Sequence, residues 1–381
     1  MSFYIAMGAR ERKSPYFKST VKAGVTHFTV YNHMYMPVSY GDMLAEYNRL
    51  IYDVAIWDVA AERQVQIIGP DAKKFIQYLT PRSLNKFSIG QGKYVPICDH
   101  LGNLINDPIA MKLDENKYWL SIADQDLLYV ARAIAAEKGF DVDVDEPDVS
   151  PLAVQGPKAE DLIVDLFGEH VRDINYFWFR ETELDGIPLV LMRSGWSKQG
   201  GFELFLQDSQ YGDVLWDKVV AAGQKYNIGP GAPNYIERIE SGLLSFGADN
   251  FPDCDPFEVG LGKLVNLERE DDFVGKAALQ KRFNTGVRRS LTGLVLDGEP
   301  IQPNAHPWGV YAGEKRIGKI SAVAYSPRLE MNIAIALIDS NYTDIGTELT
   351  VDDDAEFYKA VVHELPFGKR WRSTNPTEST T

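Results

Sequence analysis

The sequence predicts an α+β protein with a separate all-β, barrel-like domain at its C-terminal end. Apolar patterns with helical and with strand-like spacing alternate from about residue 28 to residue 283. From about residue 288 only strand-like alternation remains, with turn residues at short intervals. In addition, the order strand, Gly-Pro, helix occurs at Gly69-Pro70 and again at Gly156-Pro157, which indicates two halves built from similar units.

The bulk composition narrows the class of protein. The chain has 381 residues, of which 45% are hydrophobic, so it can form several domains with buried cores. Its net charge of −15 argues against nucleic acid or an anionic membrane as main partner, because both attract positive surfaces. The two cysteines, Cys98 and Cys254, are expected to be buried thiols in a reducing compartment. Because no apolar run reaches the length of a membrane span and the N-terminus lacks a signal-like apolar region, we expect a cytoplasmic protein.

Elements of both kinds are expected in the first 147 residues. They are, in order, one strand over 28–37 that ends at Pro37, a helix over 42–54, a strand over 62–70, a helix that Pro70 begins and Pro81 ends, a three-stranded antiparallel meander over 93–123, and a helix over 124–138 that Gly139 closes. Asn106, Asp107 and Pro108 interrupt the middle strand of the meander, which indicates a bulge or the entrance of a strand. The acidic, proline-containing segment 141–150 is a plausible domain boundary.

A second series of elements follows this boundary. It comprises a buried strand from residue 151, a helix between Pro157 and Gly168, hairpin strands over 175–186 and 187–195, and helices over 208–226, 233–246 and 271–283. The polar end of the chain is expected to be disordered.

A glycine-bounded polar loop, within residues 193–206, combines groups that suit a small-molecule site. It carries Arg193, Trp196, Lys198, Gly200, Gly201 and Glu203. A Gly-Gly pair lets the backbone approach another group closely, because no Cβ stands in the way. The pattern alone fits an ordinary hairpin loop with solvated charges equally well.

Three segments, in this order along the chain, resemble motifs of one protein family. They are SGWSKQGGFE (194–203), IERIESGLLSFGAD (236–249) and IGKISAVAYSPRLEMNIAIALI (317–338). On these motifs the chain, from about residue 14 to residue 372, resembles the glycine-cleavage T-protein family of folate-dependent methyl- and aminomethyltransferases.

This resemblance implies three domains arranged like a cloverleaf around a central folate channel. The implied ranges are residues 1–50 with 148–235, residues 51–147 with 236–285, and a β domain over 286–372, followed by a disordered tail over 373–381. The first two domains would thus be interleaved in the sequence.

Within the family, further segments are similar to the demethylases that act on dimethylsulfoniopropionate. They are TVYNHM (29–34), IWDVAAERQ (56–64), TPRSL (80–84), NDPIAMKL (106–113), EPDVSPLAVQGP (146–157) and RSGWSKQGGFE (193–203). The family's aminomethyltransferases have Asp-Asp where this chain has Asn106-Asp107. Since Asn cannot exchange a proton as an acid or a base, this difference argues against aminomethyl transfer.

The resemblance therefore implies methyl transfer from dimethylsulfoniopropionate to tetrahydrofolate, which gives methylmercaptopropionate and 5-methyltetrahydrofolate. It implies no metal and no lipoyl carrier protein, and it leaves the oligomeric state open. Open alternatives are another donor, such as glycine betaine or a methoxylated aromatic compound, aminomethyl transfer with a lipoyl carrier, or a regulatory protein that binds folate without turnover.

The implied site divides into a donor part and a folate part. Aromatic faces attract an onium cation, and the rings of Tyr31, Phe177, Trp178 and Trp196 are expected to surround it, with ordinary core packing as the other interpretation. Lys198 or Arg82 would bind the donor carboxylate. The resemblance places Asn106, Asp107 and Trp196 at catalytic positions, and Tyr94, Ser121, Glu203 and Arg238 at the folate. Glu203 would accept hydrogen bonds from the amino edge of the pterin, while Arg238 could instead form an ion pair with Glu237 or Glu240.

Overall fold

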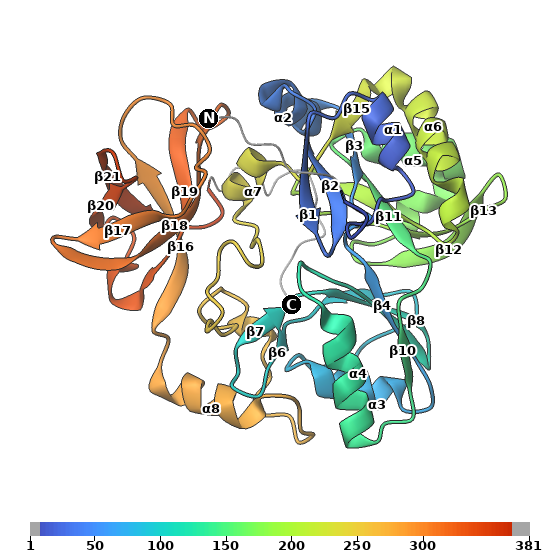
Figure 1. The fold of residues 1–381 in the computed structure, drawn as a ribbon, viewed down its shortest axis with the longest axis horizontal. Coiled ribbons are helices and arrows are strands. Elements are labelled where there is room, and N and C mark those ends of the chain that lie inside the picture. Colours follow the sequence, from blue (N-terminus) through green and yellow to red (C-terminus); the bar gives the residue numbers. More distant parts are fainter. Residues whose placement is uncertain (1–7, 368–381) are drawn as a thin grey trace. The chain divides into compact units, whose positions relative to one another are not determined.

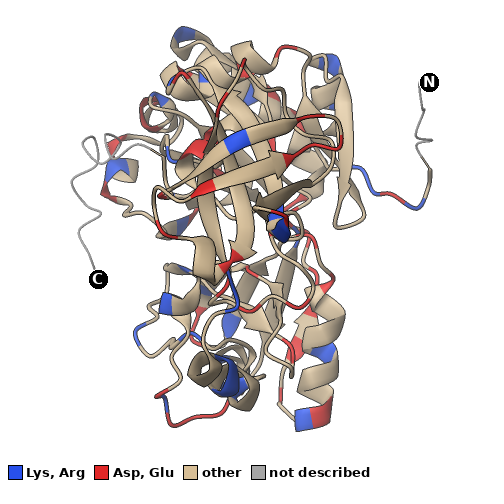
Figure 2. Ribbon diagram, turned by 90° about the vertical axis from the view of Figure 1, so that its left-hand side faces the viewer, with Lys and Arg blue, Asp and Glu red and all other residues tan. Residues whose placement is uncertain are grey.

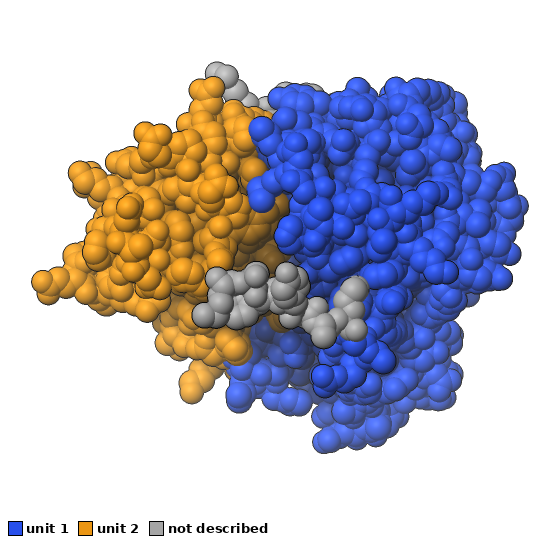
Figure 3. Space-filling view, turned by 45° about the horizontal axis from the view of Figure 1, so that its top comes forward, with its two compact units in different colours: residues 1–234, 264–276 blue, residues 235–263, 277–381 orange. Residues whose placement is uncertain are grey.

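The computed structural model describes residues 8–367, and the chain divides into two compact units (Figure 3). Unit 1 comprises residues 1–234 and 264–276, and unit 2 comprises residues 235–263 and 277–381. The expected disordered tail over 373–381 lies outside the described residues. Among the helices between residues 8 and 367, none has the length and apolar character needed to cross a membrane.

Unit 1 contains a six-stranded sheet with the strand order β12-β13-β14-β11-β3-β15. Its strands are β3 (Val54–Asp58), β11 (Ser150–Gln155), β12 (Phe179–Leu184), β13 (Ile187–Met192), β14 (Gly201–Leu206) and β15 (Ile228–Gly231). Strand β15 runs parallel to β3, and the other neighbours are antiparallel. Strand β3 therefore pairs with β11 and β15, which both follow residue 148 in the sequence. The three domain ranges stay a prediction.

A five-stranded antiparallel sheet of unit 1 has the order β10-β4-β9-β8-β5. Its strands are β4 (Gln64–Ile68), β5 (Gly92–Tyr94), β8 (Ile109–Asp114), β9 (Lys117–Ser121) and β10 (Asp143–Asp145). The predicted three-stranded meander is thus confirmed for β5, β8 and β9. Strands β6 (Ile97–Cys98) and β7 (Leu104–Asn106) instead pair with each other, because Pro108 stands at the entrance of β8 and separates it from β7.

Helices cover one face of each sheet (Figure 1). Helices α3 (Ala72–Leu79) and α4 (Leu127–Lys138) pack on the five-stranded sheet, and α5 (Ala159–Phe167) and α6 (Gly212–Gly223) pack on the six-stranded sheet. Helices α1 (Phe17–Lys22) and α2 (Met43–Tyr52) belong to the same unit. As predicted, Gly139 ends α4, in the left-handed conformation with φ of 69°.

The faces of the two sheets that the helices leave uncovered share an apolar core, which we call the inter-sheet core. It includes Met111 and Trp119 from the five-stranded sheet and Met192 and Phe205 from the six-stranded sheet. The ring centroids of Trp119 and Phe205 are 6.5 Å apart. Both sheets are therefore buried on two faces, and polar residues between them require a specific explanation.

The single strand expected over residues 28–37 is wrong. The structure has a hairpin of β1 (His27–Tyr31) and β2 (Met34–Ser39), with Asn32 and His33 in its turn at φ of 48° and 59°. Two successive residues at positive φ form the turn that suits a two-residue hairpin, and Asn tolerates this conformation. The turn lacks glycine, so its sequence signal is weak.

Unit 2 contains the expected all-β domain, a closed barrel with the order β16-β19-β18-β17-β20-β21. Its strands are β16 (Arg289–Leu296), β17 (Trp308–Ala312), β18 (Lys315–Ser326), β19 (Met331–Asp339), β20 (Glu348–Asp352) and β21 (Phe357–His363). Helices α7 (Tyr235–Ser241) and α8 (Lys276–Thr285) precede it. Closure removes the unpaired edges that a sheet of this size would otherwise expose.

Short 3-10 helices occur among the described residues at η1 (Glu169–Asp173), η2 (Ser209–Tyr211), η3 (Gln224–Tyr226), η4 (Gly262–Leu264) and η5 (Ser340–Tyr342). Acidic and basic residues are interspersed along the ribbon (Figure 2). Both cysteines are buried, as predicted, and neither forms a disulfide within residues 8–367.

Candidate active site

Strand β14 presents Glu203 to the space between the two sheets. Phe202 lies in the core under α5 and α6, whereas Phe205 lies in the inter-sheet core. Because neighbouring residues of a strand point to opposite faces, Glu203 shares the face of Phe205. On this face Glu203 lies between its cross-strand partners Met192 on β13 and Ala153 on β11. The small side chain of Ala153 leaves room beside a carboxyl group that is only 9% exposed.

The facing strands β4 and β9 contribute Gln64 and Ser121, both buried. Val65 and Leu120 face the helices, so strand alternation directs Gln64 and Ser121 toward the six-stranded sheet. The Nε2 atom of Gln64 donates to Ser121 Oγ at 2.9 Å and to the carbonyl of Glu62 at 2.7 Å. Its Oε1 atom is buried without a hydrogen-bond partner among the described residues. Such an orphan acceptor is costly, and it suits a ligand that supplies an N–H group.

Three carboxyl groups converge at this end of the inter-sheet space. Burial, and then the charges of Glu203 and Asp107, raise the pKa of Glu62 well above its ordinary value. Burial also raises the pKa of Glu203, although the Ser194 hydroxyl donates a hydrogen bond to it. Like charges in a desolvated site disfavour simultaneous ionisation, so protons or donor groups must compensate this cluster. Among the described residues, no three His, Cys, Asp or Glu side chains are arranged to hold a metal ion.

Two tyrosines complete the group around Asp107. The Tyr94 hydroxyl donates to Asp107 Oδ2 at 2.6 Å, and burial and the Asp107 charge raise the pKa of Tyr94 well above its ordinary value. Burial and the charges of Glu62, Asp107 and Asp124 likewise raise the pKa of Tyr31. Both phenols therefore stay neutral and can donate hydrogen bonds at neutral pH.

Asn106 is fully buried, and within residues 8–367 its side chain bonds backbone groups only. Its Oδ1 atom accepts from the amides of Asp107 and Ala123, each at 3.0 Å, and its Nδ2 atom donates to the carbonyls of Ala123 and Gln125 at 3.4 and 3.2 Å. An Asp carboxylate could not donate to these two carbonyls. Asn106 therefore holds Asp107 in place beside Tyr94, and its catalytic position stays a prediction.

The loop before β14 is anchored by a buried glutamine of the neighbouring strand β11. Gln155 Nε2 donates to the carbonyl of Ser194 at 2.9 Å, and Gln155 Oε1 accepts from the Ser197 hydroxyl at 2.9 Å. Ser194 in turn bonds the carboxyl group of Glu203. One buried side chain thus fixes both the loop and the donor that holds Glu203.

The Gln155 side chain also explains why two positions of the loop are glycine. A Cβ at Gly195 would lie 2.0 Å from Gln155 Nε2, and a Cβ at Gly201 would lie 2.4 Å from it. Gly200, at φ of 83°, has open space around its missing Cβ. The close approach expected of the Gly-Gly pair is therefore an approach of Gly201 to Gln155.

Three of the four predicted donor rings pack against two different cores of unit 1. Phe177 packs against the inter-sheet core, whereas Tyr31 and Trp178 pack against the core under α5 and α6. Phe177 has φ of 59°, an uncommon value for a bulky residue. Trp196 is half-buried and Lys198 is exposed in the loop. The aromatic box and the role of Lys198 stay predictions.

Arg238 lies in unit 2, where helix α7 holds it in a buried ion pair. Its Nη1 atom is 3.0 Å from Asp249 Oδ2, and both side chains are buried. The expected partner Glu240 instead bonds Ser326 Oγ at 2.5 Å and pairs with Arg328. The folate contact of Arg238 stays a prediction.

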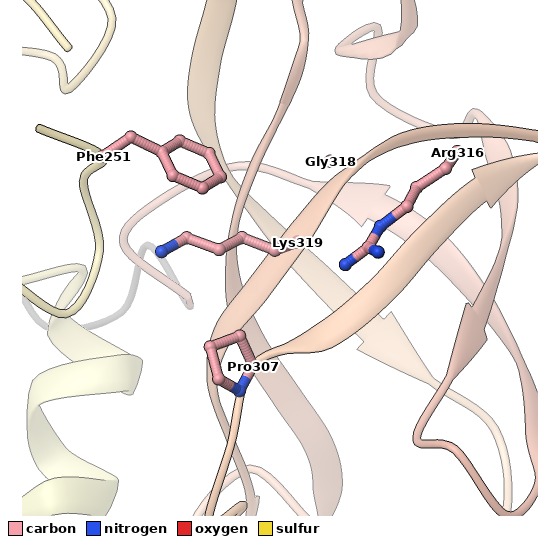
Figure 4. A pocket seen from close by; sticks show the side chains of 5 residues that line it. All are labelled: Phe251, Pro307, Arg316, Gly318 and Lys319. Carbon is pink, nitrogen blue, oxygen red and sulfur yellow. The ribbon is translucent and has the colours of Figure 1, made fainter. Parts of the chain in front are cut away.

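A hollow in unit 2 has Lys319 and Arg316 on its surface (Figure 4). Phe251, Pro307 and Gly318 complete its lining. The Lys319 ammonium lies 4.2 Å from the centre of the Phe251 ring. No predicted site residue lines this hollow.

Three functional candidates were not expected from the sequence: Glu62, Gln64 and Gln155. The only signal was the strand-like alternation over residues 62–70, in which Gln64 and Gln66 alternate with apolar residues. Gln66 Oε1 in fact accepts from the indole of Trp119 at 3.0 Å, so this side is covered by protein. Alternation does not reveal whether the polar side of a strand faces water or a second sheet.

Comparisons with known proteins agree with this architecture. The family model of the GCVT N-terminal domain matches residues 16–269, and that of the glycine cleavage T-protein C-terminal barrel domain matches residues 289–369. A crystal structure of the glycine cleavage system aminomethyltransferase T from Bartonella henselae covers 94% of this chain and 98% of its own, with a TM-score of 0.84 and 23% identity. The α+β fold with its C-terminal barrel is confirmed.

Two curated relatives cover almost the whole chain. The dimethylsulfoniopropionate demethylase of Ruegeria pomeroyi is 44% identical over 343 residues, which are 90% of this chain and 93% of that protein. An aminomethyltransferase of Listeria monocytogenes is 32% identical over 340 residues, 88% of this chain and 92% of that protein. The chain therefore belongs to the glycine cleavage T-protein family.

Proposed function

We propose that the protein transfers a methyl group from dimethylsulfoniopropionate to tetrahydrofolate and forms methylmercaptopropionate and 5-methyltetrahydrofolate. The observation that carries this proposal is the 44% identity, over 90% of the chain, to a protein named dimethylsulfoniopropionate demethylase. Another onium donor such as glycine betaine is the second candidate. We expect the reaction in the cytoplasm and without a lipoyl carrier protein.

The acceptor-rich end of the inter-sheet space suits the pterin of tetrahydrofolate. Its amide and amino N–H groups would donate to the Glu203 carboxylate, and such charge-assisted bonds favour the ionised form. The buried Oε1 atom of Gln64 offers a further acceptor. Ser194 and Gln155 hold the Glu203 side of this site before the ligand arrives, which lowers the entropic cost of binding.

The reaction requires little acid–base catalysis from the protein. The N5 atom of tetrahydrofolate attacks the methyl carbon, and the C–S bonding pair stays on sulfur, so a neutral thioether leaves. N5 then releases its proton to water. Because the leaving group is neutral, no strong general acid is needed, and positioning supplies most of the rate enhancement. This suits a site where the Asn106 side chain is bonded to backbone groups and where the phenols of Tyr31 and Tyr94 stay neutral.

Turnover with purified protein tests the proposal. Incubation with tetrahydrofolate and, in parallel, dimethylsulfoniopropionate, glycine betaine or a methoxylated aromatic acid should give 5-methyltetrahydrofolate fastest with the first donor. Faster turnover of another donor would assign that donor instead. Folate binding with no turnover of any donor would favour a regulatory protein.

A further inference from the structure

The carboxyl group of Glu62 occupies an unusual place in the site. Its backbone is fixed, since its amide donates to the Val59 carbonyl at 2.9 Å and its carbonyl accepts from Gln64 at 2.7 Å. Its carboxyl group has no hydrogen bond or ion pair to any residue in the range 8–367. Instead, the charges of Glu203 and Asp107 act on it.

Other buried carboxylates have a cation beside them or, like Asp58, a hydroxyl donor. Asp249 pairs with Arg238 at 3.0 Å, and Glu258 pairs with Arg289 at 2.9 Å. This is the ordinary solution, because an unpaired charge is costly in a desolvated site. The partly exposed carboxyl group of Glu62 has neither within residues 8–367, which indicates that its positive partner comes from outside this range.

The neighbouring groups indicate what kind of partner this is. Glu203, Asp107 and the orphan Oε1 atom of Gln64 are all acceptors, and Gln64 is only 1% exposed. A ligand must therefore supply N–H donors and positive charge together. Under the proposed function the pterin supplies the N–H groups, and the second molecule must supply the charge.

We propose that Glu62 is a specificity-determining residue that selects methyl donors whose methyl-bearing atom is positively charged. This inference rests on the proposed function, in which that atom is a sulfonium sulfur. During transfer the positive charge moves from sulfur to N5, so it stays near the carboxylate until N5 loses its proton. Glu62 therefore stabilises the bound donor and the transition state alike, and its loss should raise KM more than it lowers kcat. The neutral thioether product no longer attracts the carboxylate, which favours its release.

The test compares Glu62→Gln with wild type and with Glu181→Gln, which removes the same charge from an exposed position of β12. The probes are dimethylsulfoniopropionate and 4-methylpentanoate, its neutral isostere with carbon in place of the sulfonium sulfur. For Glu62→Gln, KM for the sulfonium should rise by about 10- to 100-fold, the effect of losing one charged contact. Its inhibition constant for the isostere, and its affinity for tetrahydrofolate, should stay at the wild-type value, and Glu181→Gln should match wild type throughout.

Several outcomes would overturn the inference while leaving the proposed function intact. One is a wild-type enzyme that binds the isostere as tightly as the sulfonium. Another is Glu62→Gln with unchanged discrimination between the two. If Glu62→Gln does not fold, Glu62→Asp serves as the second variant, because it keeps the charge and should retain most of the discrimination between sulfonium and isostere. Loss of that discrimination in Glu62→Asp would contradict the inference. Absence of methyl transfer by the wild-type protein would instead reject the proposed function.

Discussion

Glu203 shows how one residue of the site balances stability against binding. Its carboxyl group is nearly buried, lies within reach of the Glu62 charge, and has one hydroxyl donor from Ser194. Such a carboxyl group destabilises the ligand-free protein, and this destabilisation is offset when a ligand donates N–H groups to the carboxylate. An unfavourable electrostatic environment of this kind is characteristic of functional sites.

Replacing Glu203 with Gln should therefore have opposite effects on binding and on stability. The dissociation constant for tetrahydrofolate should rise about 10- to 100-fold, because bonds to a charged acceptor are lost. The melting temperature should rise, because Gln removes a desolvated charge beside Glu62 and still accepts from Ser194. Fluorescence titration and calorimetry measure the two quantities. A lower melting temperature with unchanged binding would show that Glu203 is only a structural residue.

Asp58 offers a pH-dependent prediction away from the ligand site. Burial raises its pKa from 3.8 to about 6, although the Ser14 hydroxyl at 2.5 Å and the amide of Ala60 donate to it. The folded protein thus holds this proton at higher pH than the unfolded chain. As the pH rises from about 4 to about 6, deprotonation of Asp58 should therefore lower the free energy of unfolding by about 3 kcal/mol.

The variant Asp58→Asn lacks this titration. Its stability relative to wild type should increase as the pH rises from 4 to 6 and stay constant above that range. The nearby phenols of Tyr16 and Tyr40 remain neutral there, because burial and the Asp58 charge raise their pKa values. Urea unfolding at several pH values measures the difference. A difference that does not change with pH would contradict the assignment.

At the residue scale, the sequence identified side chains that lie in a recognisable motif. Glu203 follows from the loop motif, and Asp107 follows from its place beside Asn106. Glu62 and Gln64 could not be identified, because their importance depends on a second sheet that covers them. Strand alternation indicates which residues share a face, but not what that face meets.

At the scale of elements, the loop between β13 and β14 is built around Gln155. This side chain bonds Ser194 and Ser197 and fills the space beside Gly195. The loop is therefore a fixed part of the site. Its glycines serve close packing at Gly195 and Gly201, and a turn at Gly200.

A comparison of Gly195→Ala with Gly200→Ala separates these two uses of glycine. Gly200→Ala adds a methyl group in open space at positive φ and should cost about 1–2 kcal/mol. Gly195→Ala also collides with Gln155 and should cost about 3 kcal/mol or more. Urea unfolding gives both values. In the double variant Gly195→Ala with Gln155→Ala the cost should fall below the sum of the single variants, and strict additivity would contradict the packing account.

Elements with strong periodicity were predictable, and turns that depend on uncommon conformations were not. The spacing of Phe75, Ile76 and Leu79 gives α3 correctly, since each side chain lies in the core. The hairpin turn at Asn32 and His33 was missed because neither residue is glycine. Tertiary contacts hold that turn: the Asn32 side chain donates to the carbonyls of Ala61 and Ala123, each at 3.0 Å.

At the scale of the whole molecule, the change to an all-β pattern near residue 288 was a reliable signal. Strand β16 begins at Arg289, and the barrel family model also begins at residue 289. The assignment of residues 264–276 to unit 1 could not be predicted, because it depends on contacts distant in the sequence. Arg269 makes several of them, including bonds to the carbonyls of Gln77 and Thr80 at 2.6 and 2.8 Å.

The central claim is direct methyl transfer from a sulfonium to tetrahydrofolate by this chain alone. The most direct measurement uses dimethylsulfoniopropionate with both methyl groups fully deuterated and follows the label by mass spectrometry in the purified system. The account predicts 5-methyltetrahydrofolate that carries an intact deuterated methyl group, in amounts equal to methylmercaptopropionate, without any carrier protein. Unlabelled folate product, or no product until a lipoyl carrier is added, would contradict it.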